Sequence, residues 1–319
     1  MSTLSRALLL LGCAGLTLVG ETTTVNGTEL PVTLTLEGLF GQDAATEDTP
    51  GEAVWRPGYS TVVWLDEHAA EGPVLIEFDP ENGSGRTLLS TSKLIELWGD
   101  RAGEPPSLSE PVWSPDGARV LIQTESDPLL IDLGDVTLTR LAAAGGPVEH
   151  ARFSADGRRI AWVRANDLWV FDLDRSKLIR LTDDGSETVF NGAFDWVYEE
   201  ELADRNGRAF VWSDDGAAIA WLRLDDDELP VHHIVDQMGI HSQITEQRYP
   251  KPGDPSPKPS LHVVRFDSSS NVLAPKSITF DDPRPYIPRF GFTPGGDLWY
   301  QSLDRAQEIL SLVRIDPVS

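Results

Sequence analysis

Short runs rich in β-branched and aromatic residues alternate with clusters of turn-forming residues along most of the chain. Runs of this length and composition, bounded by Asp-Gly or Asn-Gly pairs, are typical of β-strands. No segment after residue 20 keeps the 3.6-residue period of a long amphipathic helix. The pattern predicts an almost entirely β chain, with strands at residues 61–65, 120–122, 160–163, 168–171 and 219–222.

A motif of the form aromatic-Ser-x-Asp-Gly recurs at residues 112–117, 152–157 and 211–216, and residues 292–296 are a weaker fourth copy. Its serines lie 40 and 59 residues apart, and Thr293 follows the third serine by 80 residues. A period near 40 is typical of the four-stranded blade of a β-propeller. The interval of 80 then equals two blades, and that of 59 equals one blade plus an insertion of about 19 residues.

The motif itself is predicted to be structural. Asp-Gly provides the positive-φ positions of a hairpin turn, and the preceding aromatic ring packs between neighbouring blades. The repeat therefore predicts the fold and gives no information about a substrate.

Composition narrows the classes of partner. The 319 residues include 40% apolar residues, ten Trp and eleven Phe, which is enough for a substantial core. The net charge of −25 disfavours nucleic acid and anionic membrane surfaces as partners. The single cysteine excludes an intrachain disulfide, so packing alone must stabilise the fold.

The first 20 residues have the layout of an export signal, in which Arg6 precedes a short apolar run. Residues 10–13 resemble a bacterial lipobox, with Cys13 as the lipidated residue at the start of the mature chain. An ordinary signal peptide with an incidental cysteine is the alternative. Either form predicts an exported protein that is periplasmic, secreted or lipid-anchored, with no membrane contact except through such an anchor.

The predicted insertion carries three consecutive glutamates after two aromatic residues, in the stretch 195–201. A glutamate triplet alone is typical of a solvated helix face. This stretch, however, resembles the signature of the dipeptidyl peptidase IV family of serine exopeptidases. Segments similar to that family also occur in its order at residues 35–41, 227–230, 249–253 and 298–305, so that the resemblance covers residue 33 to the end.

The resemblance implies that Glu200 and Glu201 bind the free α-ammonium of a peptide, supported by Glu199, Tyr198, Trp196 and Asp195. The chemistry fits, because an α-amine with a pKa of about 8 is largely a cation near neutral pH and paired carboxylates favour that form. Adjacent side chains on a regular helix point about 100° apart. For Glu200 and Glu201 to converge on one ammonium, this short helical insertion must be a short or irregular turn, or the ammonium must lie between the directions of the two side chains.

Two departures from the family pattern limit this expectation. The family has an arginine on the propeller that helps hold the substrate carbonyl, and residues 123–129, the corresponding region, contain none. The catalytic α/β-hydrolase domain is also missing, since no Gly-x-Ser-x-Gly elbow occurs. We expect this chain to be inactive alone, with no catalytic residues of its own.

The expected domains are a signal peptide at residues 1–20 and a truncated propeller at residues 30–319. Its length suits about six blades of the eight that the family has, in an open arc. Unpaired edge strands invite completion by another chain, including a second copy.

Three functions compete at this point. The first is the propeller part of a dipeptidyl peptidase whose hydrolase domain is present in cis or in trans. The second is an exported module that binds peptide N-termini or protein partners without cleaving them. In the third, the propeller is purely structural and the glutamates are vestigial.

Other candidate sites are weak. His232, His233 and His241 match no zinc spacing, and residues 225–228 lack the alternation of a calcium loop and are expected to form a solvated turn. No phosphate loop or dinucleotide fingerprint is present. The sequence therefore predicts neither a metal nor a cofactor.

Overall fold

The computed structural model describes residues 24–25, 28–29, 53–101, 105–109, 111–124, 127–141, 146–203, 206–238, 241–278, 280 and 285–316. The chain divides into two units, residues 1–49 and 50–319. In the first unit, only the paired β1 (Thr24–Val25) and β2 (Thr28–Glu29) are described. The predicted signal peptide, Cys13 and the family-like segment 35–41 lie outside the described residues.

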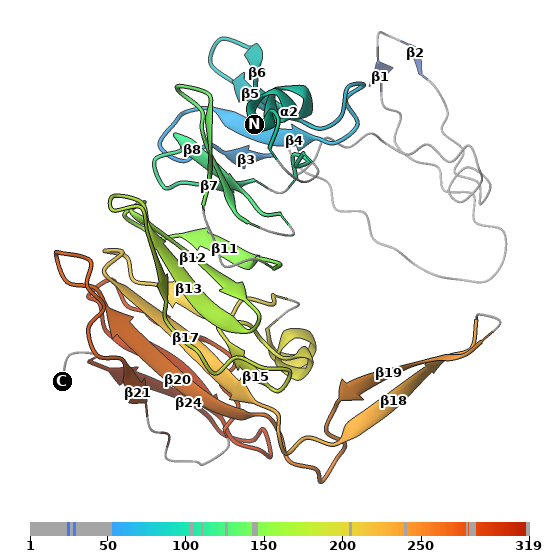
Figure 1. Cartoon of the computed structure of the whole chain (residues 1–319), viewed down its shortest axis with the longest axis vertical. Helices are drawn as coiled ribbons and strands as arrows, with labels where there is room; N and C mark the ends of the chain where they lie inside the picture. The colour runs from blue at the N-terminus through green and yellow to red at the C-terminus, as the bar shows by residue number, and fades with distance from the viewer. Residues whose placement is uncertain are drawn as a thin grey trace. The chain divides into compact units, whose positions relative to one another are not determined.

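The second unit is built from antiparallel sheets that follow one another along the chain (Figure 1). The first three sheets have four strands each. They consist of β3 (Val54–Trp55), β4 (Val62–Asp66), β5 (Val74–Asp79) and β6 (Ser84–Ser90); β7 (Val112–Trp113), β8 (Arg119–Ile122), β9 (Leu129–Asp132) and β10 (Thr137–Arg140); and β11 (Glu149–Phe153), β12 (Arg159–Arg164), β13 (Asp167–Asp172) and β14 (Lys177–Arg180).

The fourth sheet has five strands and the fifth has three. The fourth consists of β15 (Val189–Asn191), β16 (Phe210–Trp212), β17 (Ala218–Asp225), β20 (Lys258–Arg265) and β21 (Lys276–Ile278), and the fifth of β22 (Phe290–Phe292), β23 (Leu298–Leu303) and β24 (Leu310–Ile315). A two-stranded ribbon of β18 (Val231–Asp236) and β19 (Gln243–Arg248) interrupts the fourth sheet (Figure 1).

The predicted all-β architecture of four-stranded blades is confirmed. The described residues contain five of the roughly six blades that the repeat period predicts. The five strands predicted from the sequence pattern correspond to β4, β8, β12, β13 and β17.

The sequence pattern did not predict the helix α2 (Thr91–Trp98). It begins after Ser90, whose side chain accepts a hydrogen bond from the Lys93 backbone, and it buries Leu94 and Trp98, one turn apart. Two buried positions are too few to produce a visible period. Neither α2 nor any other helix in the described ranges has the length and apolar character needed to span a membrane.

Apolar side chains form a separate cluster between each pair of consecutive blades. Within β8, Val120 and Ile122 belong to the cluster shared with the first blade, whereas Leu121 belongs to the cluster shared with the third. Successive side chains of a strand point to opposite faces of the sheet, so the inner blades bury both faces. The aromatic residue of each repeated motif lies in one of these clusters, as predicted.

The repeated serine and aspartate close the turn that connects the first two strands of a blade. In the first copy, the Ser114 hydroxyl donates to Oδ1 of Asp116 at 2.5 Å and accepts from the Arg119 backbone at 2.9 Å. The second and third copies repeat both hydrogen bonds, and the three serines are buried. The motif is therefore structural, because buried hydroxyl and backbone groups need partners.

Arginine side chains connect each turn to the neighbouring blade. Arg119 donates to the carbonyl of Gly157 at 3.0 Å, and Arg159 donates to that of Gly216 at 3.1 Å. At the first blade, Arg56 donates to the carbonyl of Gly117 at 2.9 Å. The glycine turns of three consecutive blades are thus each held by an arginine of the preceding blade.

We predict that Gly117→Ala destabilises the fold far more than Gly296→Ala, the equivalent position in the fourth motif. Both glycines have positive φ, which costs an L-residue about 1–2 kcal/mol. A Cβ at Gly117 would also lie 2.1 Å from the carbonyl oxygen of Pro57, whereas none of the neighbouring atoms lies within 4 Å of a Cβ at Gly296.

The comparison is made by denaturant unfolding of the two variants and the parent chain. We expect an additional loss of at least about 2 kcal/mol in Gly117→Ala, since overpacked sites relax only partly. Equal losses in the two variants would show that backbone strain alone matters and that the blade contact does not.

Candidate functional site

The glutamate-bearing insertion is a closed loop between β15 and β16. Backbone pairing of Ala193 with Arg208, and a hydrogen bond from the Phe194 amide to the Gly207 carbonyl at 2.9 Å, join its two ends. In its described residues, the loop contains the helical element η1 (Tyr198–Leu202), which is a single π-helical turn. Its position corresponds to the insertion that the 59-residue spacing predicts.

The π turn is an irregular turn, which is one of the two arrangements expected at the glutamates. The amide of Ala203 donates to the carbonyl of Tyr198 at 2.7 Å, five residues earlier. A π turn holds more residues than an α turn, so neighbouring side chains diverge by less than the roughly 100° of a regular helix. Glu200 and Glu201 are exposed, and Glu199 is half-buried.

Tyr198 anchors the turn in the protein interior. Its side chain is 1% exposed, its ring stacks on Phe194 with centroids 5.8 Å apart, and its hydroxyl accepts from the Ile287 backbone at 3.3 Å. At the other end of the turn, Arg289 donates to the Leu202 carbonyl. Ile287 and Arg289 belong to the segment that leads into the fifth blade, so this blade helps to hold the glutamates.

Trp196 connects the insertion to the β18–β19 ribbon. The indole is 42% exposed and meets the ring of Tyr249 edge-on, with centroids 5.1 Å apart. Tyr249 in turn contacts His232 of β18 at 6.1 Å. The ribbon base and the glutamate turn are therefore in contact through aromatic rings.

Glu199 lies close to the loop backbone. A Cβ at Gly207 would lie 3.5 Å from Oε1 of Glu199, an ordinary contact, and 2.6 Å from Cε1 of His150, so a larger residue would require the imidazole to shift. Burial and the charges of Arg152 and Arg208 lower the pKa of His150 to about 4. The imidazole is thus neutral near neutral pH.

Asp195 and Asp226 are buried carboxyl groups whose charges interact. Oδ1 of Asp195 accepts from the Tyr198 amide at 3.1 Å, whereas Oδ2 has no hydrogen-bond partner. Asp226 also has a buried oxygen without a partner, Oδ1. The two residues are 2% and 3% exposed.

Burial raises the pKa of Asp195 to about 6, with a further increase from the charge of Glu199. Burial likewise raises the pKa of Asp226 to about 8, and the charge of Asp195 contributes. Two desolvated carboxyl groups whose charges repel each other favour a state in which one of them is protonated. The pair therefore keeps a proton near neutral pH.

Asp226 corrects the expectation of a solvated turn at residues 225–228. Asp227 and Glu228 are exposed, but Asp226 is buried, and Arg248 donates to the carbonyls of Asp226, Asp227 and Leu229. A run of four acidic residues gives no sign of which one points inward. Of the three histidines considered as metal ligands, His233 has its Nε2 3.3 Å from Oε1 of Glu246, and His241 is exposed.

Comparisons with known proteins agree with the sequence resemblance. A family model described as "Dipeptidyl peptidase IV (DPP IV) N-terminal region" matches residues 114–319. Dipeptidyl aminopeptidase B of Saccharomyces cerevisiae is 28% identical over 218 residues, covering 65% of this chain and 26% of the yeast protein. The "Probable dipeptidyl-aminopeptidase B" of Neosartorya fischeri is 26% identical over 344 residues, covering 94% of this chain and 35% of that protein.

The crystal structure of Porphyromonas gingivalis dipeptidyl peptidase 4 has a similar fold. It matches with a TM-score of 0.72 and 24% identity, over 88% of this chain and 40% of that protein. The chain thus spans between a quarter and two fifths of the length of these three proteins.

We predict that the acidic pair makes the fold less stable as the pH rises. Because the folded-state pKa values are raised, the folded chain holds protons that the unfolded chain has released above pH 4 or so. The stabilising contribution is complete below that pH and is lost as the pH rises through about 6 and about 8.

Asp226→Asn removes one titrating group and should flatten this dependence by about 1–2 kcal/mol between pH 6.5 and 8.5. Urea unfolding at several pH values measures the slope. Asp214→Asn, at an exposed position, is the matched control and should keep the parent slope. A parent-like slope in Asp226→Asn would contradict the raised pKa of Asp226.

Proposed function

The chain belongs to the family of dipeptidyl peptidase IV N-terminal regions, and we propose that it is the substrate-gating propeller part of a dipeptidyl peptidase IV-like serine peptidase. In this proposal, Glu200 and Glu201 bind the free α-ammonium of a peptide. A Ser-Asp-His domain, present in cis or in trans, completes the enzyme that releases N-terminal dipeptides.

The single observation that carries the proposal is the construction of the π turn. Glu200 and Glu201 are exposed at a turn whose neighbouring Tyr198 is buried and whose carbonyl at Leu202 is held by Arg289. Two carboxylates on a fixed backbone lose little freedom when a cation binds, which favours affinity. The segment packed beneath them keeps them at the surface.

Such a site selects peptides by their free end. An ammonium donates up to three hydrogen bonds, and carboxylates are its strongest acceptors. A bound N-terminus also fixes how far along the peptide the scissile bond lies, so the site can determine that cleavage occurs after a set number of residues. Hydrolysis itself needs an activated nucleophile, which this proposal assigns to the separate domain.

We predict that Glu200→Gln and Glu201→Gln each weaken peptide binding about tenfold, because each removes one charge-assisted hydrogen bond. Fluorescence anisotropy with a tetrapeptide labelled at its C-terminus measures the affinity. In the parent chain, binding should weaken above pH 8 or so, as the α-amine loses its proton.

Two controls make the assignment specific. An N-acetylated peptide of the same sequence should bind weakly to all variants, and Glu308→Gln, at an exposed site near β24, should bind like the parent. The amine site would be refuted if peptide binding survived both Glu200→Gln and Glu201→Gln, or if the N-acetylated peptide bound as tightly as the free peptide.

A further inference from the structure

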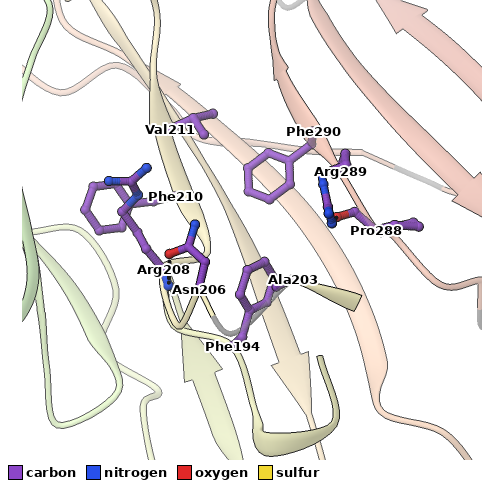
Figure 2. A pocket seen from close by; sticks show the side chains of 9 residues that line it. All are labelled: Phe194, Ala203, Asn206, Arg208, Phe210, Val211, Pro288, Arg289 and Phe290. Carbon is purple, nitrogen blue, oxygen red and sulfur yellow. Dashed lines mark hydrogen bonds between the residues drawn. The ribbon is translucent and has the colours of Figure 1, made fainter. Parts of the chain in front are cut away.

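A cavity of about 340 Å³ lies between the glutamate loop and the start of the fifth blade. This volume is at the small end of the roughly 300–1,000 Å³ of ligand sites. The lining residues come from the glutamate loop, β16 and the segment around β22, and they are Phe194, Ala203, Asn206, Arg208, Phe210, Val211, Pro288, Arg289 and Phe290 (Figure 2).

The cavity lining is basic and aromatic. It includes two arginines, an asparagine and three phenylalanines, and none of the nine residues is acidic. The whole chain has 51 acidic residues against 26 basic ones, so a lining with this charge is opposite to the average surface. Figure 2 shows Arg208 and Asn206 on one side and Arg289 on the other, with the rings of Phe194 and Phe290 between them.

Arg208 is the unusual member of this set. Its side chain is half-buried, and within the described part of the chain its guanidinium has no hydrogen bond or ion pair, only the ring of Phe210 at 5.8 Å. Burial lowers the pKa of Arg208, and the nearby charge of Arg152 lowers it further. A cation that loses water without gaining an acceptor is unfavourable unless a ligand provides one.

Glu199 does not serve as that acceptor. Although Oε1 of Glu199 lies near Gly207, the neighbour of Arg208 in sequence, the described residues show neither a hydrogen bond nor an ion pair between Glu199 and Arg208. Arg289 uses Nη1 for the carbonyls of Leu202 and Pro288, which leaves its other N–H groups for a ligand. The cavity thus has donors in excess of acceptors.

We propose that this cavity binds a carboxylate that carries an apolar side group. The Arg208 guanidinium provides a paired donor that matches the two carboxylate oxygens, and Asn206 and Arg289 supply further N–H groups. The phenylalanine rings contact the apolar part of the ligand. Both a small free acid and the C-terminal residue of a peptide have this chemistry.

The proposal is independent of the amine site, so its test uses ligands without an α-ammonium. Isothermal titration calorimetry compares 3-phenylpropionate with its uncharged amide on the parent chain. A second arm compares acetyl-Ala-Phe, which has a free carboxylate, with acetyl-Ala-Phe-amide. We expect each acid to bind at least about tenfold tighter than its amide, since only the acid pairs with Arg208.

The two arms distinguish the sources of the carboxylate. Tighter binding of acetyl-Ala-Phe than of 3-phenylpropionate points to a peptide C-terminus, and the reverse order points to a free acid. Equal binding of acid and amide in both arms, or no binding of either acid at millimolar concentration, overturns the proposal.

Variants assign the effect to the cavity. Arg208→Gln should lose at least about tenfold in affinity for the acid and nothing for the amide. Arg158→Gln removes the same charge from an exposed pair with Asp174 and should bind like the parent. Arg208→Lys keeps the charge but not the fork, and should be intermediate. Parent-like binding by a folded Arg208→Gln would also overturn the proposal. If this variant does not fold, the comparison of acid with amide on the parent chain still tests the proposal.

Discussion

The contact between consecutive blades is the interaction on which the rest of the structure depends. Each inner blade buries apolar side chains on both faces, so no blade has a complete core without its neighbours. The arginines that donate to glycine carbonyls of the next blade fix the edge of the same interface. At the first blade this arginine is Arg56, which is buried with Glu77 at 2.7 Å. Burial alone raises the pKa of Glu77, but hydrogen bonds from Arg56, Thr61 and Arg86 hold it at about 2.

The candidate site uses this interface rather than the interior of one blade. The glutamate turn begins in the fourth blade, yet Ile287 and Arg289, from the segment leading into the fifth, bind Tyr198 and Leu202. The cavity beside the turn has the same two sources for its lining. A peptide amine site and a carboxylate site would therefore both depend on the packing of the fourth blade against the fifth. Long loops are usually mobile, but contacts with the segment leading into the fifth blade hold the backbone that carries these exposed carboxylates.

Buried charged groups in this chain are stabilised in different ways. Glu77, in the first blade, is paired with arginines, whereas Asp195 and Asp226, in the candidate site, each keep an oxygen without a partner and reduce their repulsion by retaining a proton. Within the described residues, the Arg208 guanidinium has no opposite charge to pair with and stays charged although burial lowers its pKa, so it is the strongest indication of a ligand. Sequence patterns could not distinguish these cases, because burial decides them and all three kinds of residue are common on surfaces. Asp226 in particular lies in an acidic run that reads as solvated.

The sequence by itself determined the blade repeat, the insertion, five of the strands and the family, since each depends on local spacing and residue type. Ser114, Asp116 and Gly117 specify their turn through hydrogen bonds within six residues, so their pattern is visible in the chain. The irregular geometry of the glutamate turn could also be anticipated, because Glu200 and Glu201 are adjacent. Only the tertiary structure decided that Tyr198 accepts a hydrogen bond from Ile287, that the charges of Asp195 and Asp226 interact, and that Arg208 lines a cavity. These contacts join residues separated by 31 to 89 positions, and the burial that gives them their chemistry exists only after the blades pack.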